Sequence, residues 1–164
     1  MPIAEAYAFR PVTAADLPML ERWLNAPHVR RWWGEPADEV AGIAADFDEP
    51  GMESFVVLHD GVPFAYLQAY RIASDDLSFG ERPERTVGID QFIGPADMVG
   101  IGHGPAMIEA FVQKVFAKDI ERVVLDPHPD NAHAIRAYEK AGFHAFDQRM
   151  TEDGPALMMA RDRC

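Results

Sequence analysis

A glycine-rich turn at residues 99–104, with the sequence VGIGHG, is the segment of this chain best suited to holding an anion. Its alternating glycines let the backbone approach a ligand closely, and the helix predicted over 104–118 adds positive dipole character. These features favour a diphosphate on backbone N–H groups. The candidate positions are Val99, Gly100, Ile101, Gly102, His103 and Gly104. The dinucleotide-binding fingerprint would need a further glycine where Met107 stands, and a tight turn without a ligand is the alternative.

Two side chains are candidates for proton transfer. Asp90 interrupts an apolar strand predicted over 86–93, so its carboxylate lies either in a cleft or on the surface of an edge strand. Tyr138 lies on a helix predicted between Asn131 and Gly142. A phenol, with a pKa of about 10, can donate a proton, but from spacing alone a core aromatic is the first interpretation of Tyr138. Asn131 either caps this helix or binds a ligand.

The elements that must position these residues alternate only in part between strand and helix. Strands are predicted at 7–12, 54–58, 62–70, 86–93, 122–125, 143–150 and 156–160, and helices after Asp16, within 28–33 and at 37–47, 104–118 and 131–142. The Asp60–Gly61 pair predicts a hairpin between two strands. This order predicts an α+β protein whose central mixed sheet is flanked by helices. The length fits a single domain over residues 1–164.

Composition restricts the class of partner. The chain carries 27 acidic and 15 basic residues, a formal net charge of −12, which argues against nucleic acid. The charge suits a cationic small molecule, although solubility alone also explains it. The single cysteine, Cys164, excludes an internal disulfide framework, and no apolar run reaches the ~18 residues of a membrane span. No signal peptide is visible, so we expect a cytoplasmic protein without a membrane partner, either a monomer or a homodimer.

Several short motifs, taken in order, carry a family resemblance. They are WLN at 23–25, WWG at 32–34, YLQAY at 66–70, GIDQ at 88–91, the glycine-rich turn, DPHPDN at 126–131, AIRAYEKAGF at 134–143 and DGPA at 153–156. From Phe9 to Met159 the chain resembles the aminoglycoside 6′-N-acetyltransferases of the GCN5-related N-acetyltransferase (GNAT) superfamily. The turn departs from the superfamily pattern at Val99, where Gln or Arg is usual, and at Ile101, where a basic residue is usual.

The resemblance implies a GNAT fold, acetyl-CoA as the donor and the 6′-amine of an aminoglycoside antibiotic as the acceptor, and hence resistance. It assigns Asp90 to deprotonating the amine, directly or through water. Tyr138 is then the acid that protonates the leaving sulfur and a contact to the donor. We expect the backbone at Phe92 and Ile93 to bind the pantetheine arm as an added strand would, with Asn131 as a further candidate.

Substrate-binding candidates are the acidic, aromatic and amide side chains Trp33, Glu53, Tyr70, Asp90, Gln91 and Asp126. Asp126 ends an apolar strand, where its carboxylate either meets an ammonium group or serves the turn before Pro127. Trp32 and Trp33 cannot both point inward on one helix, so one belongs to the core, and Trp33 is our choice for the substrate cleft.

Metal binding is not expected, because the histidines, such as His128 and His133, lack cysteine partners and zinc-site spacing. One alternative function is a siderophore-pathway N-acyltransferase that uses acyl-CoA, which donor chain length would distinguish. Another is a non-catalytic CoA-binding regulatory module, against which the presence of both Asp90 and Tyr138 argues.

Overall fold

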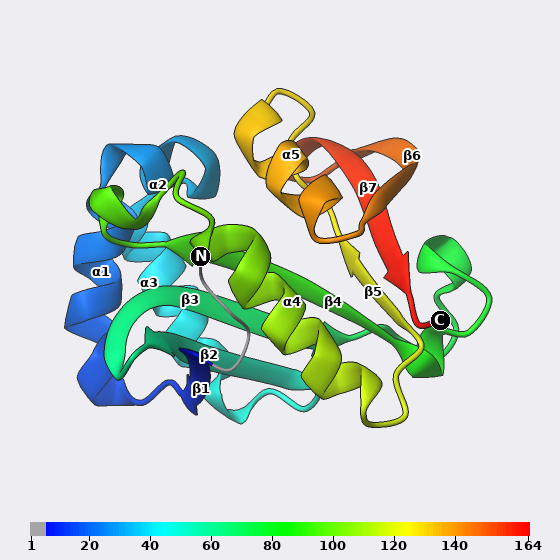
Figure 1. The fold of residues 1–164 in the computed structure, drawn as a ribbon, viewed down its shortest axis with the longest axis horizontal. Coiled ribbons are helices and arrows are strands. Elements are labelled where there is room, and N and C mark those ends of the chain that lie inside the picture. The colour runs from blue at the N-terminus through cyan, green and yellow to red at the C-terminus, as the bar shows by residue number, and fades with distance from the viewer. Residues whose placement is uncertain (1–5) are drawn as a thin grey trace. The chain divides into compact units, whose positions relative to one another are not determined.

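The computed structural model describes residues 6–164, whose seven strands form a sheet in the order β1-β2-β3-β4-β5-β7-β6 (Figure 1). The strands are β1 (Tyr7–Pro11), β2 (Met52–His59), β3 (Val62–Arg71), β4 (Thr86–Ile93), β5 (Arg122–Leu125), β6 (His144–Thr151) and β7 (Gly154–Asp162). The helices are α1 (Leu17–Asn25), α2 (Pro27–Trp33), α3 (Pro36–Ala45), α4 (His103–Phe116) and α5 (Ala132–Lys140). β4 and β5 pair in parallel, whereas β1–β2, β2–β3, β5–β7 and β6–β7 are antiparallel, so the predicted mixed sheet is confirmed.

The chain forms two compact units, each built from two segments. The described part of the first comprises residues 6–70 and 90–104, and the second comprises 71–89 and 105–164. Asp90 and the glycine-rich turn belong to the first unit, whereas Tyr138 belongs to the second. A single domain over the whole chain therefore stays a prediction.

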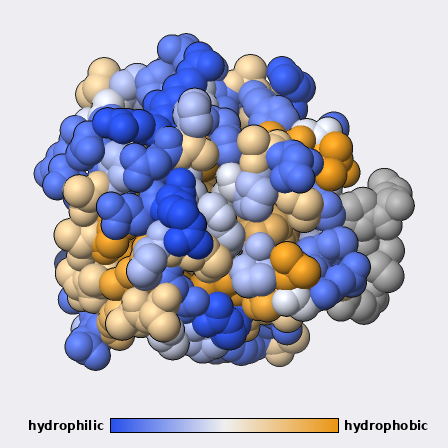
Figure 2. Space-filling view, turned by 90° about the vertical axis from the view of Figure 1, so that its left-hand side faces the viewer, coloured by the Kyte–Doolittle hydropathy of each residue, from blue (hydrophilic) through white to orange (hydrophobic). Residues whose placement is uncertain are grey.

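The first unit has a largely apolar core between its helices and its strands. The core consists of Leu20, Leu24, Val29, Ile43, Tyr66 and Phe92. The start of the first helical segment is tied down by Asp16, whose carboxylate accepts from the Thr13 N–H at 2.8 Å and from both terminal nitrogens of Arg10. Thr13 and Asp16 thus form a capping box. Figure 2, which views the left-hand side of Figure 1, shows a mainly hydrophilic surface with smaller hydrophobic areas between.

The end of β4 is held closely against α1 in this unit. Gly94 donates its N–H to the Phe64 carbonyl at 2.8 Å, and a Cβ added at Gly94 would lie 2.2 Å from the Trp23 ring. No side chain fits at that distance, so glycine is required here for close packing. The predicted Asp60–Gly61 hairpin is also confirmed, because φ is 50° and 80° at these two residues.

The second unit contains β5, α5, β6, β7 and most of α4. β5 has the predicted bounds. Asn131 caps α5, since its Oδ1 accepts from the Ala134 N–H at 3.2 Å, and Gly142 follows the helix with a φ of 89°. The segment between β3 and β4 contains two short 3₁₀ turns, Leu77–Phe79 and Pro83–Arg85. No helix within residues 6–164 is long and apolar enough to cross a membrane.

Candidate active site

Asp90 lies at the end of a chain of polar side chains in the first unit. Its Oδ2 accepts a hydrogen bond from Nε2 of Gln68 at 2.9 Å. Oε1 of the same amide accepts from the Tyr66 hydroxyl at 2.8 Å, and that hydroxyl also lies 3.3 Å from Oγ of Ser54. Because a carboxylate only accepts hydrogen bonds, the amide nitrogen of Gln68 must face Asp90 and its oxygen must face Tyr66. The amide of Gln68 therefore helps to orient the carboxylate of Asp90.

The Tyr66 hydroxyl is buried and feels the charge of several carboxylates. Burial, followed by the charges of Asp46, Asp90 and Glu39, raises the pKa of Tyr66. The phenol therefore remains protonated at neutral pH and keeps its donor role toward Gln68. Sequence reasoning assigned no role to Tyr66, Gln68, Asp46 or Glu39. The available signal was that the polar-tipped residues Tyr66 and Gln68 lie two apart, and therefore on one face, in a largely apolar strand.

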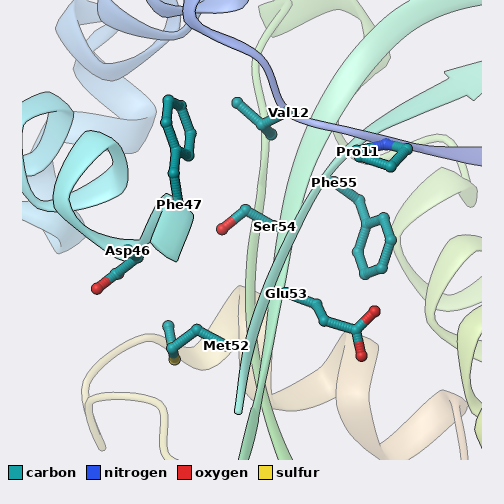
Figure 3. Close-up of a pocket in the computed structure, with 8 residues that line it drawn as sticks. All are labelled: Pro11, Val12, Asp46, Phe47, Met52, Glu53, Ser54 and Phe55. Carbon is teal, nitrogen blue, oxygen red and sulfur yellow. The ribbon is translucent and has the colours of Figure 1, made fainter. Parts of the chain in front are cut away.

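Figure 3 shows a pocket beside this polar chain, lined by Pro11, Val12, Asp46, Phe47, Met52, Glu53, Ser54 and Phe55. In the same view, Met52 and Ser54 extend to one side of β2, and Glu53 and Phe55 extend to the other. The strand register explains this, because Ser54 pairs with Gln68 and Glu53 pairs with Ala69. The structure therefore does not bring the predicted substrate residue Glu53 into the hydrogen-bonded chain that ends at Asp90.

The glycine-rich turn is exposed at residues 100–102 and buried at His103. Gly100 and Gly102 have φ values of 78° and 96°, a region that side chains other than glycine's rarely tolerate. A Cβ added at Gly104 would meet only Cδ1 of Ile93, at 3.9 Å, so the protein itself leaves room there. The turn thus presents exposed backbone directly before α4, as a backbone anion site requires.

The residues predicted at the end of β4 have different environments. Phe92 belongs to the core, whereas Ile93 is half-buried and its carbonyl accepts from Nε2 of His28 at 2.8 Å. The Trp33 ring packs against Phe92 and Tyr66 at centroid distances of 5.0 and 6.1 Å. Trp33 is therefore packed against the core, and its place in a substrate cleft stays a prediction. The candidates Tyr70 and Gln91 are both half-buried.

In the second unit, Tyr138 is half-buried on α5, with its ring centroid 6.4 Å from that of Phe143. Asn131 uses its side-chain oxygen as the helix cap described above. Asp126 directly follows β5 and is half-buried. Across residues 6–164, histidine, cysteine and carboxylate side chains form no group of three or more suited to a metal ion.

Comparison with known proteins decides the family. The model for the acetyltransferase (GNAT) domain matches residues 12–150. The chain belongs to this GNAT family of acetyltransferases. The predicted GNAT fold is thereby confirmed.

Two relatives of this acetyltransferase differ in their acceptors. Aminoglycoside N(6′)-acetyltransferase type 1 of Klebsiella pneumoniae is 34% identical over 171 residues, covering 97% of this chain and 84% of that protein. Lysine N-acyltransferase MbtK of Mycobacterium sp. (strain MCS) is 30% identical over 152 residues, covering 85% of this chain and 60% of that protein. The solved structure of aminoglycoside acetyltransferase AAC(6′)-Ib with coenzyme A and kanamycin matches with a TM-score of 0.83 and 32% identity, covering 96% of this chain and 95% of that one.

Proposed function

We propose that this acetyltransferase transfers the acetyl group of acetyl-CoA to the 6′-amine of aminoglycoside antibiotics and so confers resistance to them. The observation that carries the proposal is the Asp90 carboxylate, oriented by Gln68 and accompanied by the charges of Asp46 and Glu39 around Tyr66. Such a site attracts an ammonium group and offers a base to it. The similarity to aminoglycoside N(6′)-acetyltransferases supports the same acceptor.

The reaction removes two protons from the acceptor nitrogen and delivers one to the leaving sulfur, while a carbon–nitrogen bond forms and a carbon–sulfur bond breaks. Asp90 accepts a proton from the acceptor's ammonium, directly or through water, because an ammonium has no lone pair to attack with. The amine nitrogen then attacks the thioester carbonyl carbon, the bond to sulfur breaks, and the nitrogen loses its second proton to water as the amide forms. We assign Tyr138 to protonating the leaving thiolate, after which water restores both side chains to their starting states.

The donor is assigned to the glycine-rich turn at 99–104, with its diphosphate on backbone N–H groups and its pantetheine arm along Phe92 and Ile93. Solved relatives that bind coenzyme A or acetyl-CoA support this donor. For the acceptor we retain Tyr70, Gln91 and Asp126 as further candidate contacts. Because acetyl-CoA is supplied inside cells, we place the activity in the cytoplasm.

The test is an assay of thiol release from acetyl-CoA with kanamycin and tobramycin, followed by mass spectrometry of the product. Acetylation at the 6′-nitrogen is expected, and an analogue with a hydroxyl at 6′ should be a poor acceptor. Acetylation only at another nitrogen contradicts the proposed regiochemistry.

The second candidate function is acyl transfer from acyl-CoA to an amine in a siderophore pathway, and the similarity to a lysine N-acyltransferase supports testing it. Preference for long acyl-CoA donors and lysine-type acceptors over kanamycin would favour that function. Binding of coenzyme A without turnover of any amine would instead indicate a regulatory module.

A further inference from the structure

A buried histidine stands at the first residue of α4, directly behind the glycine-rich turn. Nδ1 of His103 lies 2.7 Å from the Tyr7 hydroxyl on β1, although the two residues are 96 positions apart in the chain. Both are nearly inaccessible, with 5% of Tyr7 and 7% of His103 exposed. The His103 ring also contacts His59 and Phe64, at centroid distances of 4.6 and 5.4 Å. His103 is therefore enclosed by side chains from three strands.

The hydrogen bond joins two neutral groups at neutral pH. Burial, followed by the charge of His59, lowers the pKa of His103. Burial, followed by the charge of Asp60, raises the pKa of Tyr7 to about 12. A neutral imidazole adds no charge to attract a phosphate, so the contribution of this residue is to hold the backbone in place.

The turn residues directly before His103 are open to solvent. Residues 100–102 are exposed, and two of them are glycines, which have the largest conformational freedom. His103, by contrast, contacts residues of a paired sheet, because its neighbours Tyr7 and His59 are opposite each other in the antiparallel β1–β2 pair. The buried His103 ring thus links the end of the turn to the sheet through Tyr7, His59 and Phe64.

We propose that Tyr7 and His103 are a positioning pair for the donor. Their hydrogen bond fixes the first residue of α4, and with it the direction of the N–H groups at Gly102, His103 and Gly104 that receive the diphosphate. The inference rests on the proposed function, since it concerns the diphosphate of acetyl-CoA. It adds a residue, Tyr7, that lies on β1 and hydrogen-bonds His103 at the end of the turn.

The test replaces Tyr7 by phenylalanine, which removes the hydroxyl and keeps the ring against Phe64. Loss of one buried hydrogen bond predicts an increase in the KM for acetyl-CoA of about three- to tenfold. The kcat and the KM for kanamycin should stay within about twofold, because the bond orients the donor and takes no part in the chemistry. With S-acetylpantetheine, a donor that lacks the diphosphate, the variant and the parent protein should have the same kcat/KM.

A second pair of variants separates the hydrogen bond from packing. His103→Leu replaces the imidazole by an apolar side chain and removes the hydrogen bond. In the His103→Leu background, Tyr7→Phe should then cause no further increase in the KM for acetyl-CoA. An unchanged KM for acetyl-CoA in Tyr7→Phe, or an equal loss with S-acetylpantetheine, overturns the positioning role. Failure of the proposed function looks different, because the unaltered protein would then fail to acetylate kanamycin or to prefer acetyl-CoA over the truncated donor.

Discussion

Gln68 is predicted to orient Asp90 during catalysis, and the substitution Gln68→Leu tests this with little change in side-chain size. The change removes the 2.9 Å hydrogen bond to Oδ2 of Asp90 and the 2.8 Å acceptor of the Tyr66 hydroxyl. Tyr66 keeps the Ser54 hydroxyl as a neighbour, at 3.3 Å. The loss therefore falls mainly on the orientation of the carboxylate.

The expected magnitude follows from the chemistry of that contact. A hydrogen bond to a charged group contributes about 1.5–3 kcal/mol, and we take the low end because Asp90 is half-buried and water partly replaces the amide. About 1.4 kcal/mol corresponds to a tenfold loss in kcat/KM for kanamycin. Asp90→Asn removes the base itself and should cost about 10²–10⁴-fold. In that background, Gln68→Leu should add little, because both changes remove the same function.

Steady-state kinetics with kanamycin and acetyl-CoA decides the matter, with circular dichroism to establish folding. The KM for acetyl-CoA should stay unchanged. Gln113→Leu is a matched control, since Nε2 of Gln113 donates to Oε1 of Glu109 at 2.9 Å on an exposed position of α4. Equal kinetics for Gln68→Leu and Gln113→Leu, or fully additive losses for Gln68→Leu and Asp90→Asn, would refute the orienting role.

Three further substitutions test the donor site, the leaving-group acid and the fold. Tyr138→Phe should lower kcat at least about tenfold with little effect on the KM for kanamycin. If kcat is unchanged and the chemical step is shown to limit turnover, Tyr138 is a packing residue and not the acid. In Gly104→Val the added Cβ would lie 3.9 Å from Cδ1 of Ile93, an ordinary contact, so the variant should fold but weaken acetyl-CoA binding; equal affinity by calorimetry contradicts the diphosphate assignment. Hydrogen bonding to Arg10 lowers the pKa of Asp16 from 3.8 to about 2. The Arg10–Asp16 pair therefore stabilises the folded protein above pH 3.8, and this stabilisation is lost as the pH falls toward 2. The urea concentration at the unfolding midpoint should therefore fall less over that pH range in Arg10→Met than in the unaltered protein. An identical pH dependence of the midpoint in the two proteins argues against a stabilising Arg10–Asp16 pair.

Local features of the fold were predictable from the sequence, because their causes act over a few residues. The bounds of β5, the Asn131 cap and the Asp60–Gly61 hairpin all follow from short-range propensities and turn chemistry. Family membership was predictable for a related reason, since the ordered motifs around Asp90 and the glycine-rich turn lie at recognisable spacing. Neither kind of signal requires knowledge of which distant residues touch.

The partners of the candidate residues were decided only by tertiary structure. Strand pairing and side-chain packing bring Gln68 to Asp90, and the packing of β1 beneath the turn brings Tyr7 to His103 across 96 positions. Register likewise directs Glu53 to the opposite side of β2 from Ser54. Such contacts depend on how strands align and which face packs inward, and a shift of one residue reverses every side chain. The sequence by itself therefore determined the residue types available for chemistry, whereas tertiary packing determined which neighbours orient Asp90 and fasten the turn.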